Sequence, residues 1–111
     1  MTPPIIANLE KLLGGPRDGA LLRFSLGNEW LKAGLPGKAA ECFRAAVECD
    51  QNYSAAWKLL GKSLADSGQG EAAQAAFEKG IAIAKQKGDI QAAQEMGVFA
   101  RRLSKLADGK A

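Results

Sequence analysis

The chain has 111 residues, enough for one domain with a continuous core but too few for two domains that would each be stable alone. Apolar residues make up 47% and charged residues 24% of the chain, which excludes a disordered composition. The net charge is +3 and there is no histidine, which excludes nucleophile–base pairs of the Ser-His or Cys-His kind.

Residues 2–13 are predicted to form a short N-terminal helix. Thr2 is the expected N-cap, because threonine accepts hydrogen bonds from the first helical turn, and Pro3 suits the first helical position. The apolar face of this helix is expected to contain Ile5, Leu9 and Leu12. Residues 14–16, with two glycines and a proline, end the helix.

The middle of the chain contains an internal repeat. Shifting the sequence by 34 positions aligns residues 20–53 with residues 54–87 without a gap. In each unit the apolar residues recur at helical spacing on both sides of a break, at residues 34–36 in the first and 68–70 in the second. Each unit is therefore predicted to be a helix, a turn and a second helix. The identical pairs are Leu26 and Leu60, Gly27 and Gly61, Gly34 and Gly68, Ala39 and Ala73, and Phe43 and Phe77.

The spacing of these residues resembles the tetratricopeptide repeat, or TPR. The second unit carries Trp57-x2-Leu60-Gly61-x2-Leu64 and then Ala73-x3-Phe77, and the first carries Leu26-Gly27-x2-Trp30 and then Ala39-x3-Phe43. Two features depart from the family pattern. The first repeat has Arg23 at the position where the family usually has tryptophan, and the two repeats have Gln51 and Lys85 at the position of the closing proline. The resemblance covers about residues 20–106. It implies an all-α fold, a right-handed α-solenoid of antiparallel helix pairs with about six helices.

Residues 89–106 are predicted to form a C-terminal capping helix or a partial repeat. Gly88 and Asp89 read as a stop followed by an N-cap, and Met96-Gly97 takes the place of Leu-Gly after a two-residue insertion. A helix pair cannot bury its apolar face alone, so we expect this segment and the helix over 2–13 to cover the two ends of the repeats. The whole chain, 1–111, is then one TPR-like domain.

Few residues indicate catalysis, metal binding or phosphate binding. Cys42 and Cys49 lie seven positions apart on one predicted helix, beyond disulfide reach, and are the only soft metal ligands. Gly61-Lys62-Ser63 is similar to the end of a phosphate-binding loop but lies inside a helical run, so we interpret it as a packing glycine with two exposed neighbours. We expect a protein that is not an enzyme, with no catalytic residue, no metal site and no cofactor.

The resemblance implies that another protein binds, as a short peptide or helix, in a concave groove lined by the first helix of each repeat. Phe24 is either an exposed anchor in this groove or is covered by the N-terminal helix. The predicted groove is apolar at one end and basic at the other, which favours a partner segment of acidic and apolar character. The groove residues carried over by alignment are Leu21, Phe24, Asn28, Leu31, Lys32, Lys58, Lys62, Asp66, Gln94, Val98, Arg101 and Arg102.

Two alternatives stay open. The chain can be a self-associating structural subunit, a homo-oligomer that uses Val98, Phe99 and Leu103 on the last helix. The surplus positive charge lies in residues 85–111, so a weaker alternative is contact with a polyanion or nucleic acid through Arg101, Arg102 and Lys105. There is no signal-peptide pattern and no apolar run of about 20 residues, so we expect a cytoplasmic protein without membrane contact.

Overall fold

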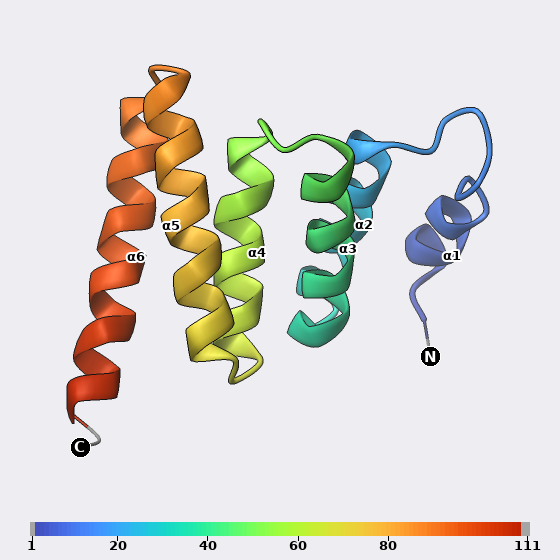
Figure 1. Cartoon of the computed structure of the whole chain (residues 1–111). Helices are drawn as coiled ribbons and strands as arrows, with labels where there is room; N and C mark the ends of the chain where they lie inside the picture. Colours follow the sequence, from blue (N-terminus) through green and yellow to red (C-terminus); the bar gives the residue numbers. More distant parts are fainter. Residues whose placement is uncertain (1, 110–111) are drawn as a thin grey trace.

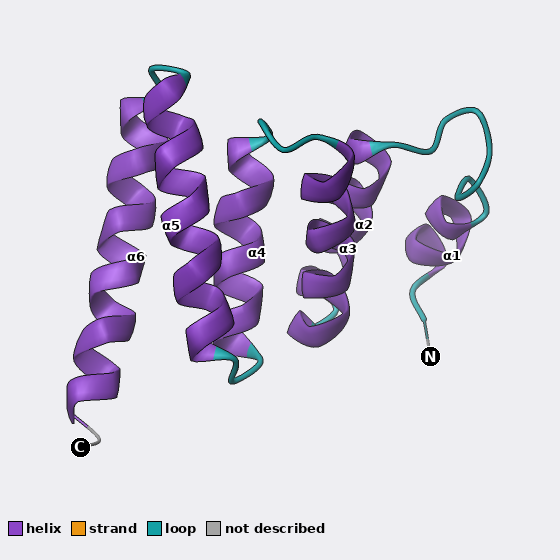
Figure 2. Cartoon of the chain, in the orientation of Figure 1, coloured by secondary structure: helices purple, strands orange, loops and turns teal. Residues whose placement is uncertain are grey.

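The computed structural model describes residues 2–109, and the side chains of residues 2–107. Within this part the chain forms six helices and no strand (Figure 1, Figure 2), which confirms the predicted all-α helical-repeat class. Lys110 and the side chain of Asp108, which were counted in the basic surplus, lie outside the described part. The helices are α1 (Pro4–Glu10), α2 (Ala20–Lys32), α3 (Pro36–Cys49), α4 (Ser54–Asp66), α5 (Gly70–Gln86) and α6 (Ile90–Gly109).

The helices stand side by side in chain order, and from α2 onward each runs opposite to the one before it (Figure 1). Each of α2 to α6 packs chiefly on its neighbours in sequence, and α4 also contacts α6 directly. The described chain is therefore a flattened array with extents of 43 × 33 × 18 Å. One face of this array is shared by α4 and α6.

Three of the chain reversals have the same local structure. Gly34, Gly68 and Gly88 have φ angles of 78°, 81° and 76°, a left-handed conformation that only glycine adopts without strain. The residue after each glycine donates its N–H to a carbonyl five positions back in the preceding helix, at 2.8 to 3.0 Å. This motif satisfies carbonyl groups at the helix end and fixes where the next helix begins.

The repeat positions form the core. Leu26 and Leu60 are 2% and 1% exposed, and Phe43 and Phe77 are 0% and 1% exposed. The glycines at the repeat position bring the helices of a pair together, because a Cβ atom on Gly27 would lie 2.6 Å from Cε1 of Phe43. Each phenylalanine therefore occupies the space that a side chain on the facing helix would need.

The N-terminal helix differs from the sequence prediction. It spans only Pro4–Glu10, with turns over residues 11–14, and its N-cap position is Pro3 with no side-chain capping bond, so the assignment of Thr2 as the cap is wrong. The Pro3 carbonyl instead accepts the N–H groups of Ile6 and Ala7. The fully buried residue is Ile6, while Ile5 is 48% exposed. The helix is thus rotated relative to the expected face and inserts one isoleucine into the core.

Arg23, at the position where the family pattern has tryptophan, anchors the loop before α2. Its guanidinium donates two hydrogen bonds of 2.9 Å to the carboxylate of Asp18, which also accepts the N–H of Gly14 at 2.9 Å. The bond from Arg23 and that from Gly14 lower the pKa of Asp18 to about 2. One carboxylate therefore ties the end of the α1 segment to α2.

Candidate functional site

The N-terminal end of the predicted groove is occupied by intramolecular aromatic contacts. Phe24 is half-buried, stacks on Tyr53 with ring centroids 4.8 Å apart, and meets the edge of Phe43 at 5.6 Å. Its ring is thus held by side chains of its own repeat and of the loop after α3. Leu21, by contrast, is 71% exposed.

Two of the predicted groove lysines are already paired with carboxylates. Lys58 on α4 lies 3.4 Å from Glu95 on α6, and Lys32 lies 3.2 Å from Glu29 on its own helix. Lys62, one turn after Lys58, forms no ion pair within the described side chains. Of the three lysines, Lys62 is therefore the one whose charge is not balanced by a carboxylate within the described side chains.

Lys62 and Arg102 flank an aromatic ring between α4 and α6. The Lys62 Nζ atom lies 5.1 Å from the centroid of Phe99, and Cζ of Arg102 lies 6.0 Å from it. Phe99 stacks in turn on the buried Phe77, with centroids 5.8 Å apart. Beside these side chains lies a hollow of about 170 Å³, which we call the Phe99 cleft. It is lined by Lys62, Ala65, Asp66, Phe77, Phe99, Arg102, Leu103 and Leu106.

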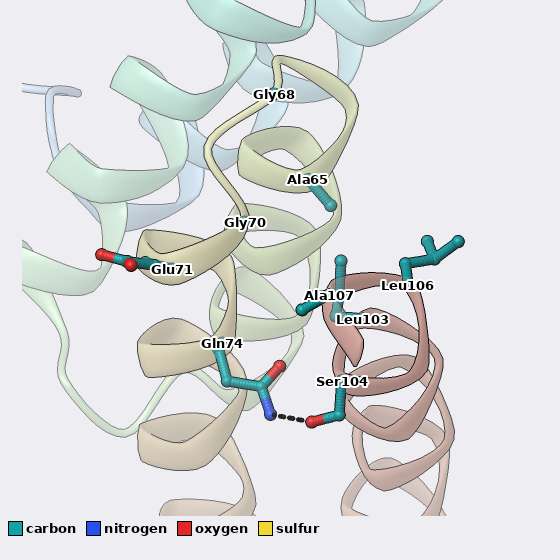
Figure 3. Close-up of a pocket in the computed structure, with 9 residues that line it drawn as sticks. All are labelled: Ala65, Gly68, Gly70, Glu71, Gln74, Leu103, Ser104, Leu106 and Ala107. Atoms are coloured by element: carbon teal, nitrogen blue, oxygen red, sulfur yellow. Dashed lines mark hydrogen bonds between the residues drawn. The ribbon is translucent and has the colours of Figure 1, made fainter. Parts of the chain in front are cut away.

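A second hollow borders the Phe99 cleft and extends to the turn between α4 and α5. Figure 3 shows the residues that line it. It has a volume of about 460 Å³, and Ala65, Leu103 and Leu106 line both hollows. On its far side Gln74 donates a long hydrogen bond of 3.5 Å to Ser104, as Figure 3 shows. The two hollows share these three residues and together form a mainly apolar trough. The cations Lys62 and Arg102 line one end together with the carboxylate of Asp66, and Glu71 lines the other end.

The structure divides the predicted groove residues of α6 between two faces. Arg102 lines the Phe99 cleft with Lys62 and Asp66. Gln94, Val98 and Arg101 instead line a different hollow against α5, so the structure does not bring them together with Arg102 in one hollow. The reason is geometric. In α4 the positions that align with these three residues face α6, but within the described residues no further helix follows α6, so the same face of α6 has no helix to meet.

Sequence reasoning missed the apolar half of the site. Phe99 and Leu103 were assigned to self-association rather than to the groove, and Leu106, which is 62% exposed, was assigned to neither. Their spacing of four and three residues places them on one face of α6, and this periodicity was a usable signal. Alignment to α4 could not find them, because the matching positions there are Ser63 and Ser67 rather than large apolar residues.

The interpretation of Gly61-Lys62-Ser63 is corrected in part. Gly61 is the expected packing glycine, since a Cβ atom there would lie 2.5 Å from Cε1 of Phe77. The two neighbours are not exposed, however: Lys62 is half-buried over Phe99, and Ser63 is 0% exposed. The Ser63 hydroxyl has no hydrogen-bond partner among the described residues.

Two further features bear on the class of protein. No three His, Cys, Asp or Glu side chains in the described part are grouped so that they could hold a metal ion. Among the helices described, none has both the length and the apolar character needed to cross a membrane.

Comparison with known proteins identifies the family. The chain is 48% identical over 101 residues to the TPR repeat-containing protein PA0015 of Pseudomonas aeruginosa, covering 91% of this chain and 96% of that protein. It is also 43% identical over 47 residues to the peroxisomal targeting signal receptor of Kluyveromyces lactis, but this match covers only 8% of the receptor. No family model matches the chain. The extended match to the Pseudomonas protein shows that the chain belongs to the tetratricopeptide-repeat family.

Solved structures agree with this assignment. The solution structure of protein BPP2914 from Bordetella parapertussis is 40% identical, with a TM-score of 0.78, and the match covers 93% of this chain and 90% of that one. A tetratricopeptide repeat domain protein from Salinibacter ruber is 25% identical, with a TM-score of 0.73 over 82% of this chain and 91% of that one. The helical-repeat arrangement is therefore shared with experimentally determined TPR proteins.

Proposed function

We propose that this chain is a non-enzymatic, cytoplasmic protein-interaction module that binds a short segment of another protein along the face shared by α4 and α6. The observation that carries the proposal is the Phe99 cleft, where Lys62 and Arg102 stand beside an apolar trough. Proteins that bind short segments commonly use such a pairing of an apolar hollow with a few charged groups. Membership of the TPR family supports a binding role.

The chemistry of the cleft favours a segment with an acidic residue next to a large apolar one. A carboxylate between Lys62 and Arg102 would pair with both cations, and both already lie near the Phe99 ring. An adjacent apolar side chain would cover Leu103 and Leu106, of which Leu106 is 62% exposed. The charge of Lys58 is balanced by Glu95, so this end of the face contributes less to binding.

The two alternatives have less support. Self-association through Val98, Phe99 and Leu103 would need one surface to include all three, but Phe99 and Leu103 line the Phe99 cleft and Val98 lines the hollow against α5. Polyanion binding meets the same difficulty, because Arg101 and Arg102 lie in different hollows.

The test is selection from a random peptide library displayed on phage, with the full chain as bait. We expect enriched peptides to carry an acidic residue beside a large apolar residue, and to lose binding to a Lys62→Glu, Arg102→Glu variant. The matched control is Lys38→Glu, Lys79→Glu, which makes the same change of charge at two exposed lysines on α3 and α5. Circular dichroism and sedimentation confirm equal helicity and mass before comparison.

Peptides that bind the control but not the cleft variant support the proposal. Enriched peptides without acidic residues, or equal binding by both variants, contradict it. A dimer in sedimentation that the cleft variant dissociates would favour the self-association alternative instead.

A further inference from the structure

Helix α6 carries a glycine at the repeat packing position with no ring against it. Met96 and Gly97 align with Leu60-Gly61, and Met96 is 0% exposed, as expected for the core position of the pattern. A Cβ atom on Gly61 would meet the Phe77 ring at 2.5 Å, but on Gly97 it would meet only Nη1 of Arg101, at 3.5 Å. The space that a phenylalanine fills beside α2 and α4 is therefore occupied beside α6 only by the exposed side chain of Arg101.

This space belongs to a broad hollow at the end of the array, between α5 and α6, which we call the end hollow. Its volume is about 710 Å³. Its apolar members include Ile90 and Val98, which are 57% and 36% exposed. A glycine inside a helix destabilises it relative to alanine, and among the described residues no aromatic ring packs on Gly97. The end hollow is lined by Ile81, Lys85, Ile90, Ala93, Gln94, Gly97, Val98 and Arg101.

The charge around the end hollow has one sign. Lys85 on α5 and Arg101 on α6 are both exposed at its border, and none of its lining residues is acidic. Because Arg101 lies across Gly97, its guanidinium is placed to pair with a carboxylate on whatever occupies the hollow.

We propose that the end hollow binds an amphipathic helix of another protein, with an aromatic side chain seated on Gly97 and acidic side chains toward Lys85 and Arg101. The packing of α3 and α5 on the glycines of α2 and α4 shows the geometry that such a partner helix would adopt. In α3 and α5 the ring that covers the glycine is preceded four residues earlier by an alanine, Ala39 or Ala73, and both alanines are 0% exposed. The partner helix is thus expected to carry a small residue, three intervening residues and an aromatic residue, flanked by Asp or Glu.

A second copy of this chain does not fit the end hollow as well. Each of the seven aromatic side chains is described, and every one is buried or half-buried. Another copy therefore has no exposed ring to place on Gly97. The end hollow and the Phe99 cleft have no lining residue in common, so this inference is independent of the proposed function.

The probe is a synthetic peptide with the sequence of residues 70–86 and the changes Lys79→Glu and Lys85→Glu, so that it carries Ala-x3-Phe and acidic side chains. Positions 78 and 82 are exposed in α5, and a lactam between them, after Ala82→Lys, holds the peptide helical. Binding to the ¹⁵N-labelled full chain is followed by amide chemical shifts. These report both the site and affinities as weak as about 1 mM.

We expect the largest shifts at Ile90, Gly97, Val98 and Arg101, and binding weaker by about tenfold or more for a peptide whose phenylalanine is replaced by alanine. Gly97→Leu should abolish binding, because its side chain occupies the place of the aromatic ring above position 97. The control protein Lys38→Glu, Lys79→Glu, which changes two exposed lysines outside the end hollow, should bind the probe as the wild type does.

Three results would overturn the inference. The first is the absence of shifts at about 1 mM probe, and the second is equal binding by wild type and Gly97→Leu. The third is a dimer of the free chain that Gly97→Leu dissociates, since the occupant would then be a second copy. Loss of binding in the cleft variant with retention in Gly97→Leu would instead move the site to the Phe99 cleft.

Discussion

Phe77 of α5 lies against the backbone of Gly61 on α4, so close that a Cβ atom at Gly61 would be 2.5 Å from Cε1 of the ring. Since Phe77 is only 1% exposed, its ring has no room to move aside. We predict that Gly61→Leu lowers the free energy of unfolding by about 1–3 kcal/mol through overpacking. Urea unfolding followed by circular dichroism measures the change.

Gly97→Leu is the matched control, because it makes the same substitution at the same repeat position. Nothing but Nη1 of Arg101 lies near a Cβ atom there. Leucine is the better helix former, so stability should be unchanged or rise by up to about 1 kcal/mol. Equal losses in both variants would mean that the contact with Phe77 is not the cause.

Ser63 is a buried hydroxyl without a hydrogen-bond partner among the described residues. Burying an unpaired polar group is unfavourable, and alanine fits the same space and favours the helix. We predict that Ser63→Ala leaves stability unchanged or raises it by about 1 kcal/mol. A clear loss in urea unfolding would show that the hydroxyl makes a stabilising bond.

Asp18 should make the free energy of unfolding depend on pH in the acid range. Its pKa falls from an ordinary value of 3.8 to about 2 in the folded chain, chiefly through the bonds from Arg23 and Gly14. A lowered pKa means that the unfolded chain binds the proton more readily, so this contribution is present above pH 4 and is lost as the pH falls toward 2. We predict that Asp18→Asn has a flatter profile of urea midpoint against pH over this range than the wild type.

The control for Asp18 is Glu78→Gln, which removes an exposed carboxylate that has no ion pair among the described side chains. Its pH profile should keep the wild-type slope. If Asp18→Asn keeps that slope as well, the ties to Arg23 and Gly14 do not stabilise the chain.

The two cysteines should differ in reactivity. Cys49 is exposed, whereas Cys42 is half-buried, and burial raises the pKa of its thiol. Because the thiolate is the reactive form, a thiol reagent at pH 8 should modify Cys49 first and Cys42 only slowly. Peptide mass spectrometry at timed intervals measures both rates. Under denaturing conditions the rates should converge, and equal rates in the folded chain would contradict the prediction.

The helices and their connections were largely predictable, because they depend on local patterns. Glycines at positions 34, 68 and 88 mark helix ends, because each adopts the left-handed conformation there. The N-cap role of Asp89 is confirmed by a 3.1 Å bond from the N–H of Ala92 to its carboxylate. The α1 helix was predicted less well. It has only seven residues, too few for the apolar spacing to distinguish the face of Ile5 from that of Ile6.

The site was predicted less completely, because it depends on which helix stands next to which. Alignment placed Lys62 and Arg102 in the predicted groove, and in the structure both line the Phe99 cleft. It could not show that Lys58 is paired with Glu95, or that Phe24 stacks on Tyr53, since these contacts join segments that lie far apart in sequence. Alignment also could not show that Val98 lines the end hollow rather than the Phe99 cleft. It does so because no further helix follows α6 within residues 2–109.

The succession of helices, each packed on the one before it, also determines how the chain can fold. From α2 to α6 the main contacts join consecutive helices across connections of only a few residues, so little loop entropy is lost before each contact forms. Chains with such local contacts fold rapidly, and a helix pair can nucleate anywhere and propagate to its neighbours. We accordingly expect unfolding to start at the N-terminal end of the array, where the short α1 helix packs chiefly on α2.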